Sequence, residues 1–290
     1  MSPCTEEVLC RTTKYFYSIP KTTSVILGAQ IVKNSFNTGE SSQCSPAEWE
    51  SRQKLAGAYR ILDHLGWTET IYGHITLRVP GPDTHFLINP YGLRYDEVTA
   101  SNLIKIDLEG NIIGTSHYRI NRPGFVIHSA VHSARNDAHC VLHTHTVAGM
   151  AVAAQRKGLL PISMPATGFH ERISYHDFEG PSLELSERER LVANLGNKNV
   201  MILRTHGLLT CGTTLEQAFI LMFRLQRACE IQIAAQSAGG ELIVPPKDVR
   251  ERSAILTDEF LSDYGGHNAG KLEFDSYLRL IDRKDPTYRD

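Results

Sequence analysis

Two histidines separated by one residue are the sharpest chemical feature of this 290-residue chain. His143 and His145 follow the apolar run Cys140-Val141-Leu142, which is typical of a buried β-strand. Side chains two positions apart on a strand point to the same face, so both imidazoles can reach one metal ion at about 2.0–2.1 Å. The alternative is a hydrogen-bonded histidine pair at the edge of a sheet, and the spacing alone leaves both interpretations open.

His206 stands at the end of a second apolar, β-prone run, Met201-Ile202-Leu203. Histidines at the ends of two strands predict an open metal site in which His143, His145 and His206 bind the ion and leave a position for water or substrate. A closed structural zinc site would need a fourth protein ligand, and Cys140 is expected on the strand face opposite His143. The predicted cofactor is one divalent metal ion, because zinc, iron, manganese and cobalt all accept imidazole nitrogen.

Four further histidines are candidates for the same neighbourhood. His128 and His132 are four residues apart on a predicted helix, so they share one face and could hold a metal, or His128 could be a distant fourth ligand. Alternatively, both pack against the site through hydrogen bonds, and the HExxH pattern is absent because Ser129 follows His128. His170 and His176 lie in a loop-like segment that could approach the pocket, or they are ordinary polar loop residues.

Helix caps and short β-prone runs mark the elements that would position these residues. Ser45-Pro46-Ala47-Glu48 predicts a helix that Gly66 ends, and Pro123 opens a second helix that runs to about Arg135. Thr213-Thr214-Leu215-Glu216 starts a third, long helix. Helices on both sides of mostly short strands predict an α/β layered domain. The predicted strands are Ile71–Val79, His85–Asn89, Leu103–Asp107, Asn111–Ile113, Cys140–His145 and Val200–Arg204, with a further helix at Val147–Lys157.

Composition limits the class of partner. Hydrophobic residues make up 41% and charged residues 21% of the chain, and the net charge of −2 gives no global field that attracts nucleic acid. No window reaches the roughly 18 apolar residues of a membrane span, and no secretory signal is visible. The six cysteines are scattered without a CxxC pair, as in a reducing compartment. We therefore expect a cytoplasmic protein with a small-molecule or protein partner.

Three segments are expected along the chain. Residues 1–43 are rich in Ser, Thr and Lys and carry little hydrophobic pattern, which predicts a poorly ordered N-terminal extension. Residues 44–245 contain the predicted helices and strands and form the folded domain. Residues 246–290 are a C-terminal extension whose end, Phe274–Asp290, mixes charges as a solvated or interface-capping tail would, and simple disorder is the alternative.

Several separate segments resemble the class II aldolase/adducin family, in the order in which the family has them. They are Gly73-His74-Ile75-Thr76-Leu77-Arg78-Val79, His85–Leu93, His143-Thr144-His145 and Arg204-Thr205-His206-Gly207-Leu208, with Glu97–Ser101 and Ala228–Gln232 similar to the adducin head domain. The resemblance implies a three-layer α/β/α fold with a mostly antiparallel central sheet and a homotetramer with sites at subunit interfaces. It also implies a zinc-type site on the three histidines derived above.

The chain departs from the family at the residues that carry its chemistry. By resemblance, Gly124 stands at the position of the family's catalytic glutamate, and much of the phosphate loop is replaced. The likeness therefore implies a metal site without the usual base. The substrate-binding candidates are Gly73, Asn89, Gly92 and Arg122. The candidates that would replace the glutamate as acid or base are His74, His128, Tyr175 and His176.

Three functions are compatible with this pattern. The first is a metal-dependent lyase or decarboxylase acting on a small carbonyl or hydroxy-acid substrate. The second is an adducin-like, non-enzymatic protein with a cytoskeletal, actin-binding or scaffold role and a structural metal, although residues 241–290 hold no lysine cluster of the kind found in adducin tails. The third is a retained fold with neither metal nor catalysis.

Overall fold

The computed structural model describes residues 44–81, 84–180, 186–263 and 267–290, and the predicted N-terminal extension at 1–43 lies outside the described residues. The strands are β1 (His74–Arg78), β2 (Phe86–Ile88), β3 (Ile104–Ile106), β4 (Cys140–Thr144), β5 (Ile173–His176), β6 (Val200–Leu203) and β7 (Gly207–Gly212). The helices are α1 (Pro46–His64), α2 (Arg122–Ala134), α3 (Val147–Ala153), α4 (Met164–Thr167), α5 (Glu187–Leu195), α6 (Leu215–Ser237), α7 (Lys247–Asp263) and α8 (Lys271–Lys284), with short 3-10 turns η2 (Tyr95–Glu97) and η4 (Pro286–Arg289).

A seven-stranded sheet carries the fold, in the order β3-β2-β1-β4-β7-β6-β5. Neighbouring strands are antiparallel except for β5 and β6, which are parallel. His143 on the central strand β4 pairs with His74 of β1 on one side and with Leu209 of β7 on the other. The sheet confirms the predicted α/β class with mostly antiparallel strands, and its register places His74 beside the predicted metal ligands.

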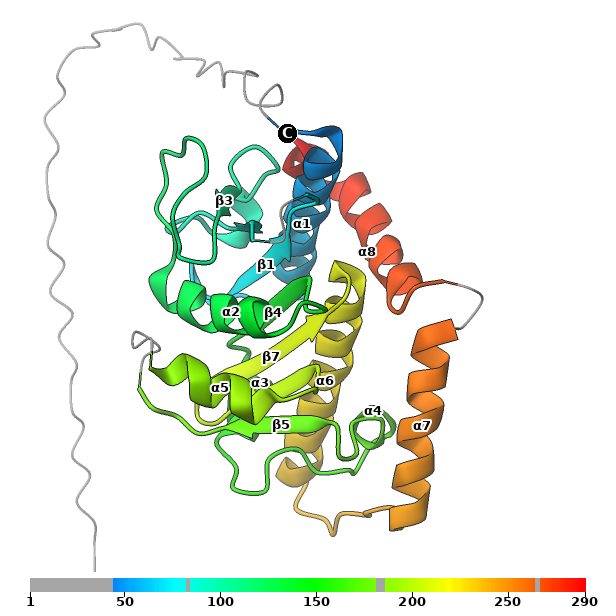
Figure 1. The fold of residues 1–290 in the computed structure, drawn as a ribbon. Coiled ribbons are helices and arrows are strands. Elements are labelled where there is room, and N and C mark those ends of the chain that lie inside the picture. Colours follow the sequence, from blue (N-terminus) through cyan, green and yellow to red (C-terminus); the bar gives the residue numbers. More distant parts are fainter. Residues whose placement is uncertain (1–43, 82–83, 181–185, 264–266) are drawn as a thin grey trace, which may run out of the picture. The chain divides into compact units, whose positions relative to one another are not determined.

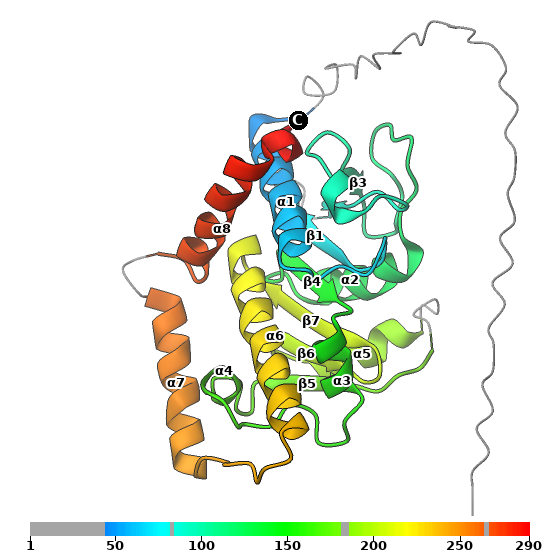
Figure 2. The ribbon, with the colours of Figure 1, turned by 180° about the vertical axis from the view of Figure 1, so that it is seen from behind.

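Helices cover both faces of the sheet and give three layers. α2 and α5 lie on one face (Figure 1), and α1, α3, α6 and α8 lie on the other (Figure 2). Successive residues of β4 alternate between two cores: Leu142 packs in the same core as Phe219 of α6, whereas Val141 packs in the same core as Ile127 of α2. By the same alternation, His143 faces the side of α2.

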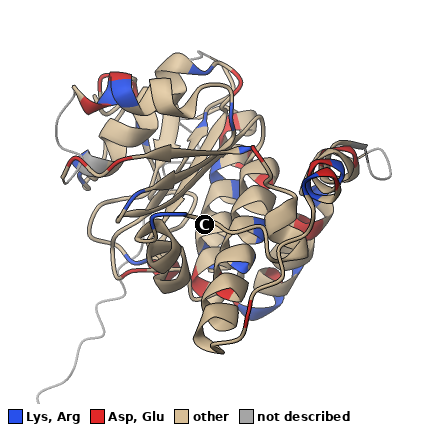
Figure 3. Ribbon diagram, turned by 90° about the horizontal axis from the view of Figure 1, so that it is seen from below, with Lys and Arg blue, Asp and Glu red and all other residues tan. Residues whose placement is uncertain are grey.

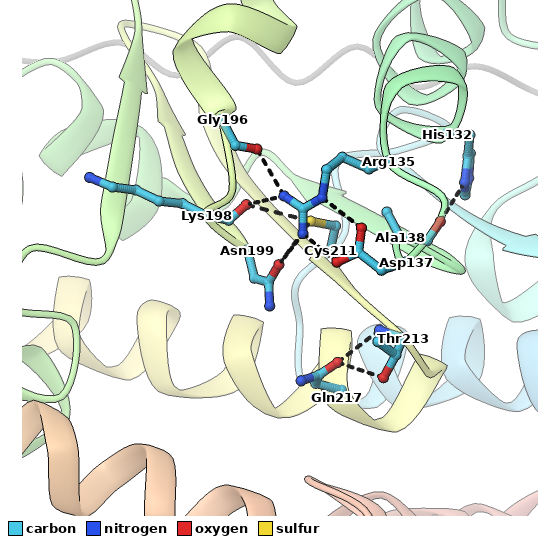
Figure 4. Close-up of polar contacts among 10 residues, drawn as sticks. All are labelled: His132, Arg135, Asp137, Ala138, Gly196, Lys198, Asn199, Cys211, Thr213 and Gln217. Atoms are coloured by element: carbon cyan, nitrogen blue, oxygen red, sulfur yellow. Dashed lines mark hydrogen bonds and ion pairs between the residues drawn. The ribbon is translucent and has the colours of Figure 1, made fainter.

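Helix starts follow the caps expected from the sequence. Ser45 Oγ accepts a hydrogen bond from the backbone N–H of Glu48 at 3.2 Å, as predicted for the start of α1. At α6 the cap is Thr214, one residue later than Thr213, and its side chain accepts from the backbone N–H of Gln217 at 3.1 Å. Gln217 Oε1 accepts from the backbone N–H of Thr213 at 2.7 Å (Figure 4). Side chains therefore satisfy backbone donors on both sides of this helix start.

One arginine holds the C-terminal end of α2. Arg135 Nε and Nη2 donate to the two carboxylate oxygens of Asp137, each at 2.7 Å. The same guanidinium donates to the backbone oxygens of Gly196 at 2.9 Å and Lys198 at 3.1 Å, and to Asn199 Oδ1 at 2.9 Å (Figure 4). These bonds tie α2 to the segment between α5 and β6, and so fix the helix that carries two of the candidate histidines.

The segment expected to be a solvated or interface-capping tail is instead part of the core. α8 and η4 pack against α1, and α8 also packs against α6, with Phe274, Ile281 and Tyr288 buried. The prediction of a tail is wrong because the apolar residues at 274, 277, 278 and 281 recur at helical spacing and form one face of α8. The mixed charges occupy the remaining positions of the helix.

Other differences from the predicted elements are smaller. Asn111–Ile113 is not a strand, and its pairing is one isolated bridge between Ile106 and Ile112. α3 ends at Ala153, before the predicted Lys157. The sequence analysis did not predict α4, β5, α5, β7, α7 and α8.

Charges of both signs are mixed over the described helices. Figure 3 shows lysine and arginine beside aspartate and glutamate on several of them. Pairs one helical turn apart, such as Lys54 with Glu50 and Lys271 with Asp275, are examples. Among the helices that the structure describes, none combines the length and the apolar character needed to cross a bilayer.

Candidate metal centre and its cavity

Two strand ends bring the three predicted metal ligands together. His143 is on β4, His145 follows its end, and His206 lies in the turn between β6 and β7. The ring centroids are 4.5 Å apart for His143 and His145, 4.8 Å for His143 and His206, and 4.9 Å for His145 and His206. One nitrogen of each ring lies within 4.8 Å of the other two. The three imidazoles therefore converge on one place from two separate stretches of chain.

Hydrogen bonds fix the protons on two of the three rings. His143 Nδ1 lies 2.8 Å from the carbonyl oxygen of Leu208, and because a carbonyl can only accept, this nitrogen carries the proton. His145 Nδ1 lies 2.7 Å from Glu69 Oε2 and donates to it in the same way. With one proton on each ring, the two Nε2 atoms hold lone pairs, although they are 2.7 Å apart.

Two lone pairs at that distance repel each other unless a proton or a metal cation lies between them. A divalent ion bound by both nitrogens would remove this repulsion, and His143 and His145 are the residues that would hold it together with His206. The donor set also has the right chemistry, because metal ligation uses the unprotonated nitrogen of a neutral imidazole. The three residues fit a divalent metal ion.

Burial keeps the rings of His143 and His206 neutral. It lowers the pKa of His143 well below the ordinary value for histidine, with the neighbouring His206 and His145 adding to the effect. Burial likewise lowers the pKa of His206 to about 4, with His145 as the second cause. At neutral pH, protons therefore do not compete with a metal ion for these two nitrogens.

The turn that presents His206 has a strained backbone. Thr205 adopts a left-handed conformation with φ 52°, which is uncommon for a residue with a branched side chain. Its backbone N–H donates to the oxygen of Ala153 at 3.2 Å, and the N–H of His206 donates to Leu203 at 3.1 Å. This arrangement aims the His206 ring back toward β4, and strain of this kind is often found at functional sites.

The carboxylate that orients His145 comes from the loop between α1 and β1. The backbone of Glu69 is held in this loop by Tyr72, whose backbone N–H donates a hydrogen bond to the backbone carbonyl oxygen of Glu69 at 2.8 Å. A carboxylate on the non-ligating nitrogen fixes a metal-binding histidine and raises its basicity. Sequence reasoning missed Glu69 because it belongs to no motif and lies 76 residues from His145.

The three histidines open into a cavity of about 1380 Å³. Three other predicted site residues, Gly73, His74 and Arg122, also line it. Gly73 has φ +82°, and a Cβ there would lie 2.6 Å from Tyr95 Oη, so the wall requires glycine at this point. The outer wall is largely aromatic and aliphatic and includes the partly exposed Tyr72, Tyr91, Ile112 and Phe178.

Two of the predicted substrate-binding residues are not part of this wall. Asn89 is buried, and its Oδ1 accepts a hydrogen bond from Tyr59 Oη at 2.9 Å. Gly92 lies beyond the wall, while its neighbour Tyr91 belongs to it. The segment Asn89–Gly92 therefore supports the cavity mainly through one aromatic side chain, and not through the two residues singled out from the sequence.

Tyr175 and His176, two of the predicted acid–base candidates, also lie away from the cavity. Tyr175 Oη accepts a hydrogen bond from the backbone N–H of Leu159 at 3.2 Å, and the guanidinium of Arg204 lies 4.1 Å from the centre of its ring. His176 is held between Asn194 at 2.9 Å and Glu187 at 3.4 Å. Both are side chains of β5 at the edge of the sheet, where His176 pairs with Leu203 of β6 and is close enough to His206 to help lower its pKa, although it does not line the cavity. His170 likewise does not line the cavity.

His128 and His132 bond to Thr76 and not to a shared ion. Thr76 Oγ1 lies 2.7 Å from His128 Nδ1 and 2.7 Å from His132 Nε2. Of the alternatives left open by the sequence, hydrogen-bonded packing behind the site is the one that the geometry supports. The His128 ring contacts the His74 ring, with centroids 4.2 Å apart, and does not itself line the cavity.

His74 occupies the space that a side chain at position 124 would need. A Cβ added to Gly124 would lie 2.6–2.7 Å from three atoms of the His74 ring. Both ring nitrogens of His74 are buried and have no hydrogen-bond partner in the described part of the chain. Burial lowers the pKa of His74 to about 3, with His145 and His206 adding to it. Unpartnered buried groups cost about 1–3 kcal/mol each, so such a ring favours a ligand that pairs with it.

Two arginines in the cavity wall escaped the sequence analysis. Arg188, from α5, donates to Ser129 Oγ and lies 5.4 Å above the ring of Phe125. Arg119 reaches the wall from a loop that forms a bridge with Tyr91. Together with Arg122 they give the wall three guanidinium groups, which suit carboxylates and phosphates. They come from separate segments, so no local spacing could have grouped them.

Comparison with known proteins places the chain in a family. The model of the Class II Aldolase and Adducin N-terminal domain matches residues 53–233. A candidate aldolase class 2 protein of Pseudomonas aeruginosa is 45% identical over 248 residues, which cover 86% of this chain and 95% of that protein. Alpha-adducin of Rattus norvegicus is 40% identical over 266 residues, which cover 88% of this chain and 36% of adducin.

A solved structure agrees with these matches. The crystal structure of an aldolase II superfamily protein from Pseudomonas syringae superposes with a TM-score of 0.81 at 50% identity, covering 86% of this chain and 99% of that one. The family model spans more than half of the chain and includes His143, His145 and His206. This chain belongs to the class II aldolase and adducin family.

Proposed function

We propose that this protein is a divalent-metal-dependent lyase, of the aldolase or decarboxylase type, acting on a small carbonyl or hydroxy-acid substrate. The observation that carries the proposal is the open triad: the Nε2 lone pairs of His143 and His145 meet at 2.7 Å, with His206 beside them, at the wall of a large cavity. A structural zinc site has four protein ligands, whereas the described residues offer three here. Zinc is the expected ion.

The remaining chemistry falls to residues of the chain. When bound, a divalent ion supplies Lewis-acid stabilisation of negative charge on a substrate oxygen. In the aldolase form of the proposed reaction a base takes the proton of the substrate hydroxyl, a carbon–carbon bond next to a carbonyl breaks with its electron pair moving toward the carbonyl oxygen, and the base then returns that proton to the carbon. His74 is the group placed to hold that proton, because its ring lies in the wall beside His143 and fills the space at Gly124.

The proposed substrate carries a carboxylate. Arg119 and Arg122 line the cavity, and within the described part of the chain neither side chain has an ion pair or a hydrogen bond. Both guanidinium groups are thus available for a bidentate contact with an anion. The changed phosphate loop, with Asn89 and Gly92 outside the wall, argues against the phosphate cradle implied by family resemblance.

An adducin-like role is the second candidate, supported by the 40% identity with alpha-adducin. In that case the metal ion would stabilise the fold, and the protein would bind filamentous actin or act as a scaffold. Co-sedimentation with filamentous actin at physiological salt separates the two. Binding that survives His143→Ala would favour the adducin-like role, whereas no binding by the wild type would end it.

The assembly and the compartment are also proposals. The family resemblance supports a homotetramer with sites near subunit interfaces, and the scattered cysteines support the cytoplasm. Sedimentation equilibrium of the purified chain tests the first, and imaging of a fluorescent fusion tests the second. A monomer at micromolar concentration would contradict the proposed tetramer.

Metal analysis is the deciding experiment. Protein purified without an affinity tag should contain about one divalent ion per chain, and His143→Ala and His206→Ala should each lose it. His267→Ala, an exposed histidine away from the triad, is the matched control and should keep the ion. Less than about one ion per several chains in the wild type would overturn the proposal.

A substrate screen then tests the reaction. Hydroxy and keto acids with and without a phosphate group are offered to the metal-loaded protein, and carbon dioxide or aldehyde release is followed. Turnover should stop in chelator and return with the ion, and Arg122→Ala should raise KM for carboxylate substrates more than it lowers kcat. Full turnover in excess chelator would exclude a metal-dependent lyase.

A further inference from the structure

A buried chain of hydrogen bonds runs behind the cavity. His132 Nδ1 lies 2.8 Å from the carbonyl oxygen of Ala138 (Figure 4), and His132 Nε2 lies 2.7 Å from Thr76 Oγ1. Thr76 Oγ1 lies 2.7 Å from His128 Nδ1 in turn. Thr76, His128 and His132 are each at most 1% exposed, so water does not compete for these bonds.

The protons in this series of hydrogen bonds can be placed by counting donors. The carbonyl of Ala138 only accepts, so His132 Nδ1 carries a proton, and in a neutral ring His132 Nε2 is then an acceptor. Thr76 has one hydroxyl proton, which it must donate to His132. Its oxygen therefore accepts from His128 Nδ1–H, which leaves His128 Nε2 as a bare lone pair. Burial supports the neutral rings, since it lowers the pKa of His132 to about 3 and that of His128 well below its ordinary value.

The end of this relay lies against His74. In the described part of the chain, His128 Nε2 has no hydrogen-bond partner and neither ring nitrogen of His74 makes a well-aligned hydrogen bond, although the backbone of Gly73 is close enough to act on the pKa of His74. The two rings are in contact, with centroids 4.2 Å apart and planes tilted by 54°. The unprotonated Nε2 of His128 therefore lies next to the His74 ring, whose N–H can donate to it. In enzymes without bound substrate, hydrogen bonds of this kind are often long and tighten on binding.

We propose that His128 is a positioning residue for His74: its Nε2 accepts the N–H of His74, so that His74 turns its unprotonated nitrogen toward the cavity and the metal ligands. The Ala138 carbonyl, outside the cavity, fixes the proton on His132 Nδ1. Through Thr76 this determines that His128 Nε2 is the acceptor in the contact with His74. The relay makes His74 a proton acceptor toward substrate, and this consequence rests on the acid–base role of His74 proposed above. The tautomers of His128 and His132 follow from the hydrogen bonds to Thr76 and Ala138 and do not depend on that role.

Solid-state nitrogen NMR of metal-free protein labelled with ¹⁵N-histidine tests the relay directly, because it distinguishes protonated from bare imidazole nitrogens. His128→Gln and His132→Gln assign the signals. We expect His132 and His128 to be protonated at Nδ1 and bare at Nε2, and His74 to carry one proton. A wild-type His128 protonated at Nε2, or doubly protonated at pH 7, would overturn the proposal even if the protein proves to be a metal-dependent lyase.

Substitutions at Thr76 test which group sets the polarity. Thr76→Val removes the hydroxyl at similar volume and should shift part of the His128 population to the Nε2-protonated form, whereas Thr76→Ser should keep the wild-type tautomer. Thr210→Val is the matched control, because Thr210 is a buried strand threonine whose hydroxyl donates to Ala218 O at 2.9 Å, outside the relay. Unchanged His128 signals in folded Thr76→Val would refute the relay, and a loss of the wild-type tautomer in Thr76→Ser would do the same if Thr76→Val does not fold.

Kinetics add a readout once a substrate is in hand. Because His128 acts through His74 and does not touch the substrate, Thr76→Val and His128→Gln should lower kcat about tenfold or more and leave KM within about twofold. Thr76→Ser should retain most of the wild-type kcat. A change confined to KM would contradict a positioning role.

Discussion

The position of single protons decides what the metal centre can bind. The backbone oxygen of Leu208 and the carboxylate of Glu69 accept hydrogen bonds from Nδ1–H of His143 and His145. The lone pairs on the two Nε2 atoms then face one point. A backbone carbonyl cannot be mutated away, but the carboxylate can. Glu69 is therefore the residue outside the triad at which a single substitution tests the site most cleanly.

Glu69→Gln should weaken metal binding about 10–100-fold, the usual loss when the partner of a ligating histidine is changed. The amide still fills the space and can accept from His145 Nδ1, but it lacks the negative charge that raises the basicity of the ring. Competition with a fluorescent chelator measures the affinity. Glu50→Gln, which removes a charge from an exposed i,i+4 pair with Lys54, is the control and should leave the affinity unchanged. Equal affinities for both variants would contradict the assigned role.

His132 should make the stability of the metal-free protein depend on pH. Its folded pKa is about 3, lowered by burial and then by Arg78, whereas the unfolded value is about 6.5. Between these values the unfolded chain binds a proton that the folded chain refuses. The stabilisation is complete above about pH 6.5 and is lost as the pH falls toward 3, by about 1.4 kcal/mol per pH unit at most for this one group.

Urea unfolding in chelator at pH 7.5, 6.0 and 5.0 measures this effect. Wild type should lose stability over the series, and His132→Gln should lose less of it between pH 6.0 and 5.0, by about 1 kcal/mol. The absolute stability of the variant does not matter, because the comparison is of slopes. Identical slopes would show that His132 is not the titrating group.

At the scale of elements, local signals were enough to predict the starts of the helices and the strands that carry the ligands. The serine cap of α1, the proline of α2 and the apolar runs before His143 and His206 each lie within a few residues of the feature they predict. Three histidines could be grouped because each one lies at or just after the end of a buried strand. Their convergence needs the antiparallel pairing of β4 with β7 and of β7 with β6, and β7 was not predicted from the sequence.

The supporting residues could not be predicted in this way. Glu69, Thr76 and Arg188 reach the site through contacts between elements distant in sequence. No motif near them in the sequence predicts which residue each one contacts. The pairing of His74 with His143 depends on the register of β1 against β4. A shift of β1 by one residue would move the His74 side chain to the other face of the sheet. The sequence does not predict β5, which is why His176, with His170, is expected in a loop-like segment that could approach the pocket.

The contact between β1 and the start of α2 yields a prediction of its own. Gly124→Ala should destabilise the protein by about 1–3 kcal/mol, because its Cβ would overlap the His74 ring, which His128 and His143 hold from two other sides. In a His74→Ala background the same change should be neutral or stabilise by up to about 1 kcal/mol, since alanine favours a helix over glycine. Equilibrium unfolding of the four proteins completes the cycle. Additive effects of the two changes would contradict mutual exclusion of the two side chains.

At the scale of the whole described unit, the C-terminal helix completes the layer that covers one face of the sheet. The end of the chain lies beside the start of α1 in Figure 1, and the backbone N–H groups of Ala100 and Ser101 donate to Tyr288 and Asp290 at 2.8 and 2.9 Å. Mixed charges in Phe274–Asp290 disguise this role in the sequence, because the apolar residues that matter are spaced by three and four positions. Alternation of charges along a helix is compatible with a buried face.

Phe274→Ala should therefore cost about 3–5 kcal/mol of unfolding free energy. The ring is 1% exposed and packs edge-on against Phe219 of α6, with centroids 5.5 Å apart, so its loss opens a cavity between two helices that cannot readily close. Leu272→Ala is the matched control two residues away on α8: its side chain is 48% exposed, and the change should stay within about 0.5 kcal/mol. Urea unfolding at pH 7.5 with a common m-value compares the two. If Phe274→Ala is as mild as Leu272→Ala, α8 does not contribute to the core and the segment behaves as the solvated tail that its charges suggest.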